Sequence, residues 1–142
     1  MSCTSRIVRF PDGTEITASP LCARRAENGT RDFGLYMDPQ WAPTWEAVLI
    51  DWPDFGLPAN PEQAAAQIRD AFERAQAGDR VEIGCIGALG RTGTVLACMA
   101  ILAGIPPNEA VAWIRANYDP RAVETEEQER WVGWFADHTQ QD

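Results

Sequence analysis

Residues 80–104, RVEIGCIGALGRTGTVLACMAILAG, constrain the fold more than any other stretch of the chain. Val81 and Ile83 alternate in a short β-type run that ends at Gly84, and an apolar helical run then extends from Arg91 to a stop at Gly104. This stretch therefore predicts a strand, a tight loop that contains glycine, and a helix in immediate succession.

The loop between this predicted strand and helix is typical of an anion-binding site. A loop that leads into a helix N-terminus directs several backbone N–H groups at one place, where the helix dipole favours negative charge. Cys85 begins the loop, and positive potential favours the thiolate form of a cysteine. Arg91 ends the loop, and a guanidinium group can bind two oxygens of one oxyanion. The combination indicates phosphate-ester chemistry at a cysteine sulfur.

The composition indicates one soluble globular domain that spans residues 1–142. The chain is 45% hydrophobic and 23% charged, and it is long enough to bury a core. We expect a cytoplasmic protein with no membrane partner, because no apolar run approaches ~20 residues and the first residues lack the core of a signal peptide. A net charge of −9 without a basic stripe argues against a nucleic-acid partner.

The cysteines and the histidine argue against several kinds of metal, disulfide and catalytic site. The four cysteines show no paired spacing that would indicate a zinc site or a disulfide framework. Cys98 lies among apolar residues and is expected to be a core thiol. His138 is the single histidine and lies near the C-terminus. A catalytic triad or a metal site that uses histidine is therefore nearly excluded.

The remaining elements predict an α/β (α+β) fold with a short mixed, centrally parallel β-sheet flanked by helices. Strand candidates are residues 6–10 and 14–18, which flank a turn as a hairpin, and residues 32–38 and 46–51. Helix candidates are residues 60–78, with Asn60 as N-cap and Gly78 as stop, residues 108–117, and a last helix from Thr125. Between the hairpin and the next strand, Arg24, Arg25 and Arg31 are expected to be solvated loop charges, with contact to an anionic substrate as the alternative.

Residues 52–58, WPDFGLP, follow the fourth predicted strand directly. Prolines stiffen both ends of this stretch and Gly56 permits a pivot, which suits a lid that moves as a unit. Asp54 would be the group that such a lid delivers to the cysteine loop. The alternative is a simple turn that closes a strand, and only Cys85 and Arg91 downstream favour the lid.

These motifs together carry a family likeness. CX5RTG begins at Cys85, WPDFGLP precedes it, and VETEEQ follows at residues 123–128. In this combination the chain resembles the cysteine-dependent protein tyrosine phosphatase superfamily, particularly its small dual-specificity branch, over about residues 32–135. Competing motifs fit less well, because a nucleotide-binding phosphate loop would need Gly at position 85 and Lys at position 91. A rhodanese-like sulfur carrier would leave WPD unexplained.

The resemblance implies a phosphatase that hydrolyses phosphotyrosine in a phosphorylated protein or peptide, and it leaves open whether phosphoserine or phosphothreonine is also a substrate. Cys85 would attack phosphorus and form a phosphocysteine intermediate, while Asp54 would protonate the leaving oxygen and later accept a proton from water. Thr92 would donate a hydrogen bond from its hydroxyl to the departing thiolate. The phosphoryl oxygens would bind the Arg91 side chain and the backbone N–H groups of Ile86, Gly87, Ala88, Leu89, Gly90 and Arg91. No metal or cofactor is implied, since the loop supplies the charge stabilisation.

The chain departs from the family pattern at a few positions. Gly84 stands where the family has a histidine that helps to depress the thiol pKa, and Gly87 and Ala88 place the loop glycine one position early. These departures motivate an alternative, a phosphate-binding pseudophosphatase that recognises phosphoproteins with little turnover.

Two residues near the last helix are candidates for positioning water. Glu124 stands where the longer tyrosine-specific members have a water-positioning glutamine and small dual-specificity members often have glutamate, and the alternative for it is a structural role. Gln128 either caps the last helix as the partner of Thr125 or helps to place the hydrolytic water, and the two roles are compatible. The sequence leaves the oligomeric state open, since its six tryptophans could line a substrate groove or a dimer surface.

Overall fold

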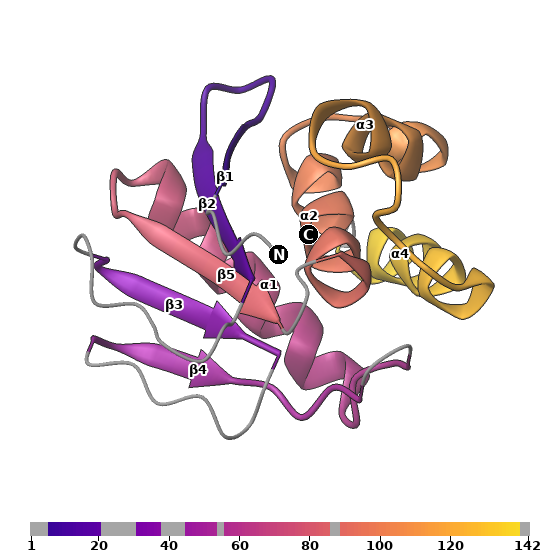
Figure 1. Cartoon of the computed structure of the whole chain (residues 1–142), viewed down its shortest axis with the longest axis horizontal. Coiled ribbons are helices and arrows are strands. Elements are labelled where there is room, and N and C mark those ends of the chain that lie inside the picture. Colours follow the sequence, from indigo (N-terminus) through magenta and orange to yellow (C-terminus); the bar gives the residue numbers. More distant parts are fainter. Residues whose placement is uncertain (1–5, 21–30, 38–44, 54–55, 86–88, 140–142) are drawn as a thin grey trace.

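A computed structural model describes residues 6–20, 31–37, 45–53, 56–85 and 89–139 (Figure 1). In this described part, five strands form one sheet in the order β1-β2-β5-β3-β4. β1 and β2 pair in antiparallel fashion, whereas the β2–β5, β5–β3 and β3–β4 pairs are parallel. The strands are β1 (Arg6–Arg9), β2 (Glu15–Pro20), β3 (Phe33–Tyr36), β4 (Ala47–Leu49) and β5 (Val81–Cys85). The predicted hairpin and the centrally parallel arrangement are confirmed.

The helices form layers beside this sheet. α1 and α2 contact the strands, and α3 and α4 pack against α2 on the side away from the sheet (Figure 1). They are α1 (Pro61–Gln76), α2 (Gly90–Leu102), α3 (Ala110–Asn117), which a short 3-10 turn (Pro107–Glu109) precedes, and α4 (Glu126–Thr139). The predicted mixed α/β architecture is therefore correct.

α1 forms for the local reasons that its sequence indicates. The Asn60 side chain accepts a hydrogen bond from the Gln63 N–H, and Pro61 occupies the first turn, where no backbone donor is needed. The helix ends just before Gly78, which adopts φ of +108°. Its buried side consists of the apolar residues expected from their spacing, Ala64, Ala65, Ile68, Ala71, Phe72 and Ala75.

β5 lies at the centre of the molecule and positions Cys85. All five of its residues are buried, and it lies between β2 and β3. Because side chains alternate along a strand, Val81 and Ile83 contribute to the hydrophobic core while Glu82 faces the other side of the sheet. Cys98 lies in the core of α2, where burial raises the pKa of its thiol, as expected for a structural cysteine.

A buried polar cluster surrounds Glu82 on that other side. The Glu82 carboxylate accepts hydrogen bonds from the Ser19 hydroxyl and from the Tyr36 hydroxyl, the latter at 2.6 Å. It also forms an ion pair with Arg31, at 3.2 Å between Nε and Oε2. The expectation of a solvated Arg31 was therefore wrong, because a buried carboxylate requires charged or hydrogen-bonding partners.

The described tryptophans pack within the chain. Trp52 and Trp131 are buried and contact each other edge to face, with ring centroids 5.4 Å apart. Trp134 stacks on Trp131, Trp113 stacks on Phe10, and the Trp45 indole donates to the Tyr36 hydroxyl.

Within the residues that the structure describes, no helix has the length and apolar character needed to cross a bilayer.

Candidate active site

Cys85 is the last residue of β5 and lies against the first turn of α2. The Thr92 hydroxyl donates a hydrogen bond to the Cys85 sulfur at 3.0 Å, and both residues are buried. α2 begins without a side-chain cap, because its N-cap residue is Leu89. A helix N-terminus that no side chain caps keeps its partial positive charge directed at the sulfur region.

Arg91 follows immediately in the same turn and is also buried, with 6% of its surface exposed. Its Nη1 donates to the carbonyl oxygen of Met37 at 3.0 Å and to that of Trp52 at 2.9 Å. Met37 is itself held, because its N–H donates to the Gly84 carbonyl beside Cys85. The guanidinium group is thus fixed between the end of β3 and the segment that carries the predicted lid.

The described part of the predicted lid is connected to the rest of the site. The Gly56 carbonyl accepts hydrogen bonds from the Trp52 indole at 2.8 Å and from the Gln128 side-chain amide at 3.2 Å. Asp54, the predicted acid, and Phe55 lie outside the described residues. The residues on either side of them are thus joined to Arg91 through Trp52 and to α4 through Gln128.

Gln128 occupies the N-terminal turn of α4 and is fully buried. Its backbone N–H donates to the Thr125 hydroxyl at 3.0 Å, which is the helix cap that the spacing predicts. The side-chain amide does not return to the N–H of Thr125, as a capping box would require. Its oxygen instead accepts from the Glu124 N–H at 2.8 Å, while its nitrogen reaches Gly56.

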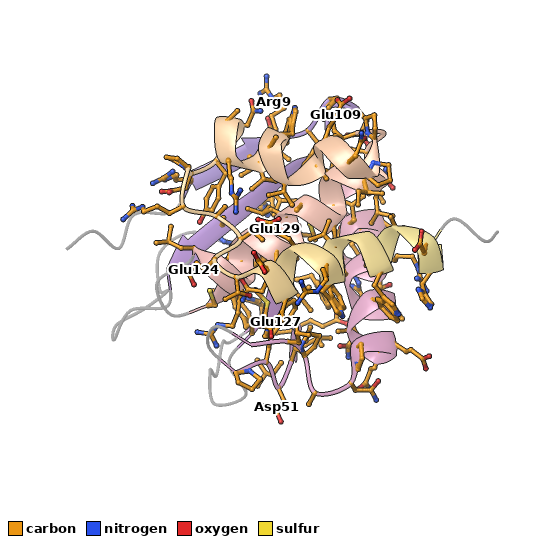
Figure 2. The ribbon with its side chains drawn as sticks, turned by 90° about the vertical axis from the view of Figure 1, so that its right-hand side faces the viewer. Arg9, Asp51, Glu109, Glu124, Glu127 and Glu129 are labelled. Carbon is orange, nitrogen blue, oxygen red and sulfur yellow. The ribbon has the colours of Figure 1, made fainter. Side chains whose placement is uncertain are left out.

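Glu124 lies just before α4, at the start of the acidic stretch labelled in Figure 2. Its backbone N–H is held by Gln128, and its carboxylate contacts the first turn of α2. A methyl group added at Gly90 would lie 2.1 Å from the Glu124 Oε1, so a larger residue at position 90 would displace this carboxylate. The structure thus brings Glu124, Gln128, Arg91, Thr92 and Cys85 to one end of α2.

The remaining predicted loop residues are only partly described. Leu89 and Gly90 begin α2, whereas Ile86, Gly87 and Ala88 lie outside the described residues. Gly84, which replaces the family's histidine, is buried in β5 beside Tyr36 of β3. Among the described side chains, no three histidine, cysteine, aspartate or glutamate residues are grouped as metal ligands would be.

Comparisons with known proteins give this arrangement a family. No protein-family model matches the chain. Two uncharacterised proteins of Methanocaldococcus jannaschii are each 34% identical to this chain over 110 residues. Each match covers 69% of this chain, and the matches cover 71% of the first relative and 66% of the second. Among solved structures, Tk-PTP in its active form is 28% identical, with a TM-score of 0.71 over 92% of this chain and 96% of that one. The chain belongs to the cysteine-based protein tyrosine and dual-specificity phosphatase superfamily.

More distant members of the superfamily share the fold across nearly the whole chain. Kinase associated phosphatase superposes with a TM-score of 0.77 at 13% identity, covering 100% of this chain and 99% of its own. The Yvh1 phosphatase domain from Chaetomium thermophilum has a TM-score of 0.70 at 16% identity, covering 94% and 96%. The protein tyrosine phosphatase-like fold predicted from the sequence is thus confirmed.

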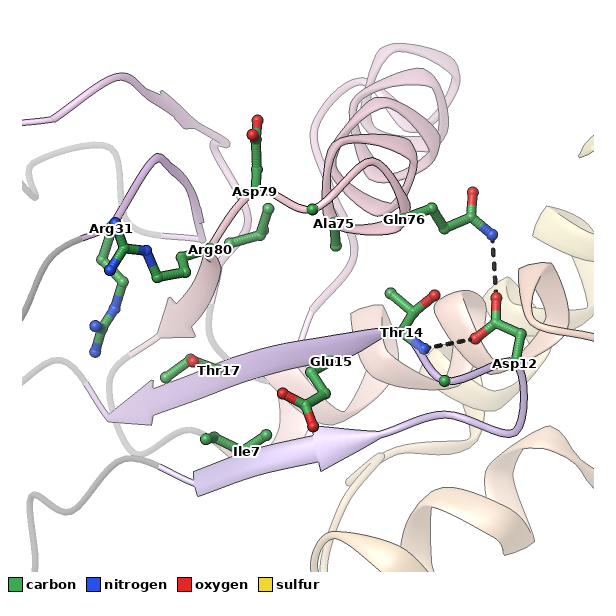
Figure 3. Close-up of a pocket in the computed structure, with 13 residues that line it drawn as sticks. Ile7, Asp12, Thr14, Glu15, Thr17, Arg31, Ala75, Gln76, Asp79 and Arg80 are labelled. Carbon is green, nitrogen blue, oxygen red and sulfur yellow. Dashed lines mark hydrogen bonds between the residues drawn. The ribbon is translucent and has the colours of Figure 1, made fainter.

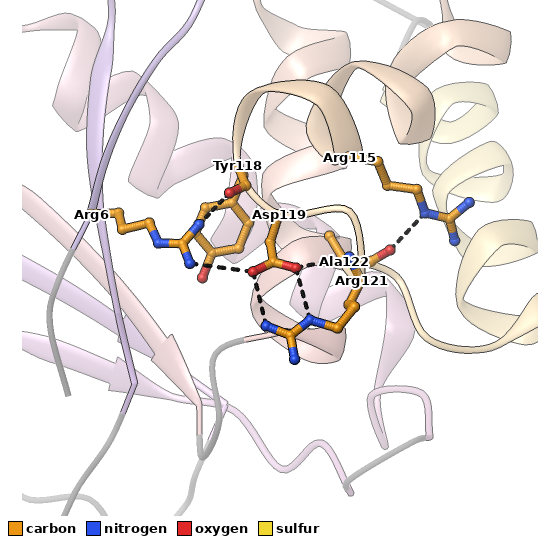
Figure 4. Close-up of polar contacts among 6 residues, drawn as sticks. All are labelled: Arg6, Arg115, Tyr118, Asp119, Arg121 and Ala122. Atoms are coloured by element: carbon orange, nitrogen blue, oxygen red, sulfur yellow. Dashed lines mark hydrogen bonds and ion pairs between the residues drawn. The ribbon is translucent and has the colours of Figure 1, made fainter. Parts of the chain in front are cut away.

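Tyr118 interacts electrostatically with Cys85, and no sequence pattern indicated a link between the two residues. Burial raises the pKa of its phenol to about 12, the charge of Cys85 contributes to the increase, and Arg6 opposes it. The Arg6 guanidinium lies over the Tyr118 ring and also pairs with Asp119 (Figure 4). No sequence signal could have found this contact, because Arg6 and Tyr118 are brought together only by the fold.

A pocket lies at the opposite end of the sheet from Cys85, where β2 and β5 begin (Figure 3). Its volume is about 590 Å³, and acidic and basic side chains both line it. Asp12 accepts hydrogen bonds there from the Thr14 N–H at 3.0 Å and from the Gln76 amide at 3.1 Å. Since Cys85 ends β5, this pocket is separated from the candidate active site by the length of the strand.

Proposed function

We propose that the protein is a phosphatase that hydrolyses phosphotyrosine monoesters of proteins or peptides without a metal ion, with phosphoserine and phosphothreonine monoesters as the further candidate substrates. One observation carries the proposal: Thr92 donates a hydrogen bond to the Cys85 sulfur at the uncapped N-terminus of α2. A cysteine sulfur that accepts a hydrogen bond beside a helix N-terminus has the kind of surroundings in which nucleophilic cysteines occur. Superfamily membership supports the same chemistry.

The reaction would proceed in two displacements at phosphorus. The Cys85 thiolate would attack phosphorus while the bond to the ester oxygen breaks, and Asp54 would give its proton to that oxygen. Water would then attack the phosphocysteine, Asp54 would take a proton from the water, and sulfur would leave as a thiolate. The 3.0 Å contact with the Thr92 hydroxyl supports its role in stabilising that leaving group.

The contacts of Arg91 and Gln128 support further proposed roles. Arg91 would bind two phosphoryl oxygens, and its anchors at Met37 and Trp52 support a fixed orientation for this. The predicted lid acid Asp54 lies in sequence between Trp52, which contacts Arg91, and Gly56, which contacts Gln128. Gln128 and Glu124 would place the hydrolytic water.

The test is phosphate release from an aryl phosphate and from phosphotyrosine and phosphoserine peptides in the presence of a chelator. We expect turnover by the wild-type protein, none by Cys85→Ser, and a loss of about 100-fold or more in Arg91→Ala. Asp54→Asn should lower the rate and alter the pH profile. Cys98→Ala is the matched control, since it changes a cysteine of the core and should keep activity. Turnover that survives Cys85→Ser would overturn the assignment, and phosphate binding without turnover in the wild type would favour a pseudophosphatase.

A further inference from the structure

Val123 adopts a strained backbone conformation beside the candidate active site. Its φ is +62°, and it is the only residue other than glycine with a positive φ in the described part of the chain. This left-handed region is unfavourable for a β-branched side chain, because the branched Cβ crowds the backbone. Such a conformation persists only where the surrounding contacts enforce it.

Two side chains hold the backbone around Val123. Arg115 of α3 donates from Nε to the Ala122 carbonyl at 2.8 Å and from Nη2 to the Val123 carbonyl at 2.7 Å. Gln128 accepts the N–H of the next residue, Glu124, at 2.8 Å. The guanidinium group of Arg115 is further oriented by Glu129, at 3.2 Å. Three consecutive residues, 122–124, are thus fixed in one shape.

Residues 122–124 pack directly on the first turn of α2. A methyl group added at Gly93 would lie 2.6 Å from the Ala122 Cβ and 3.0 Å from the Val123 nitrogen. At Gly90 the Glu124 carboxylate approaches as closely. These two glycines flank Arg91 and Thr92. Residues 122–124 therefore pack closely against the turn that carries Arg91 and Thr92.

We propose that Arg115 is a positioning residue of this site, and the proposal rests on the phosphatase function proposed above. Arg115 maintains the left-handed conformation of Val123, which keeps residues 122–124 against Gly90 and Gly93. This contact fixes the α2 turn, and with it Arg91 and the Thr92 hydroxyl, in the geometry that binds a phosphoryl group. Without the two hydrogen bonds from Arg115, Val123 relaxes to negative φ and the segment moves away from the turn.

The first experiment measures the affinity for inorganic phosphate by calorimetry, together with kcat and KM for an aryl phosphate. Arg115→Ala should weaken phosphate binding by about tenfold or more and lower kcat/KM by a similar factor, because relief of the strain displaces the α2 turn. Arg115→Lys should behave alike, since an ammonium group lacks the planar fork that reaches both carbonyls. The control is Arg74→Ala, which removes an arginine that also pairs with two carboxylates but lies on α1. It should lower the melting temperature without changing the phosphate affinity.

The second experiment separates positioning from general stabilisation. Glycine adopts positive φ without steric cost, so Val123→Gly removes the strain that Arg115 opposes. In the Arg115→Ala background, Val123→Gly should restore phosphate affinity to within about threefold of the wild type. A purely stabilising role for Arg115 would change the melting temperature but would give no such rescue.

The outcomes are distinct. If folded Arg115→Ala or Arg115→Lys binds phosphate as the wild type does, or if Val123→Gly fails to rescue, the positioning role is overturned. A wild type that binds phosphate but does not hydrolyse esters contradicts only the proposed function, and the rescue experiment still applies to binding. A wild type that does not bind phosphate overturns both.

Discussion

The ionisations of Tyr118 and Cys85 are coupled across the candidate site. The charge of the Cys85 thiolate adds to the effect of burial and raises the pKa of Tyr118 to about 12. Burial and the hydrogen bond to Glu82 raise the pKa of Tyr36 beyond that, so the first phenolate to form on titration belongs to Tyr118. The phenol thus reports on the charge of the proposed nucleophile.

We predict that Cys85→Ser lowers the pKa of Tyr118 toward its ordinary value of 10.0, because the thiolate charge is removed. The measurement is the ultraviolet absorbance of phenolate as the pH is raised. Cys98→Ser is the control and should leave this titration unchanged, since Cys98 does not contribute to the shift. Identical first transitions in Cys85→Ser and wild type would show that the two groups are not coupled.

The raised pKa of Tyr118 also has a consequence for stability. The folded state holds the phenol proton more tightly than the unfolded state, so this stabilisation is complete below pH 10 and is lost between about pH 10 and pH 12. We therefore expect Tyr118→Phe to lose less of its free energy of unfolding over this interval than the wild type does. Urea unfolding at several alkaline pH values measures the free energy of unfolding of both proteins. An equal loss of this free energy in Tyr118→Phe and wild type would contradict the prediction.

The helix caps and the apolar helix face that sequence patterns predicted depend on contacts between residues that are close in the chain. The Asn60 cap, the apolar side of α1 and the Thr125 hydroxyl cap of α4 all involve residues three or four positions apart. The hydrogen bond from Gln128 to Gly56 joins residues 72 positions apart, and no periodicity encodes it. For the same reason, the order in which β5 lies between β2 and β3 required the structure.

β3 contains a close contact that the sequence did not indicate. The ring of Tyr36 lies over Gly34, where an added methyl group would be 2.2 Å from a ring carbon. Glycine at this position lets the Tyr36 hydroxyl reach the buried carboxylate of Glu82 on β5. The strand therefore depends on glycine for a packing reason, although glycine in a strand interior is otherwise unfavourable.

We predict that Gly34→Ala lowers the free energy of unfolding by about 1–3 kcal/mol, because the added methyl group must displace the Tyr36 ring from Glu82. Gly133→Ala in α4 is the matched control. Nothing lies within 4 Å of a methyl group at Gly133, so alanine should stabilise the helix by about 0.5–1 kcal/mol. Chemical denaturation of both variants measures the opposite signs, and a neutral Gly34→Ala would refute the contact.

At the scale of the whole molecule, a polar cluster joins the N-terminal hairpin to the helical layers. Arg6 of β1 pairs with Asp119 beyond the end of α3, and Arg121 binds the same carboxylate (Figure 4). Asp119 is 3% exposed and also accepts the Arg121 N–H at 2.8 Å. Sequence patterns predicted the hairpin and the helix, but not this contact, since Arg6 and Asp119 are 113 positions apart.

The cluster predicts how the stability of the fold changes in acid. Burial alone would raise the pKa of Asp119, but the hydrogen bonds from Arg121 and the nearby charges of Arg121 and Arg6 outweigh it and hold the pKa below the ordinary 3.8. A carboxyl group with a lowered pKa in the folded state stabilises the fold above the unfolded-state pKa, and this stabilisation is lost as the pH falls through the folded-state value. The ionised carboxylate thus stabilises the contact between the hairpin and the helices at neutral pH, and this stabilisation is lost in acid.

We expect Asp119→Asn to lower the free energy of unfolding at neutral pH by about 1–3 kcal/mol, because charged hydrogen bonds are lost at a buried site. As the pH falls through the ordinary carboxyl pKa of 3.8, this variant should lose less stability than the wild type, since it lacks the carboxyl group that takes up a proton on unfolding. Asp70→Asn, which removes an exposed carboxylate paired with Arg74, should follow the wild-type pH dependence closely. If wild type and Asp119→Asn respond equally to acid, the hairpin and the helices are held together by apolar packing and not by this carboxylate.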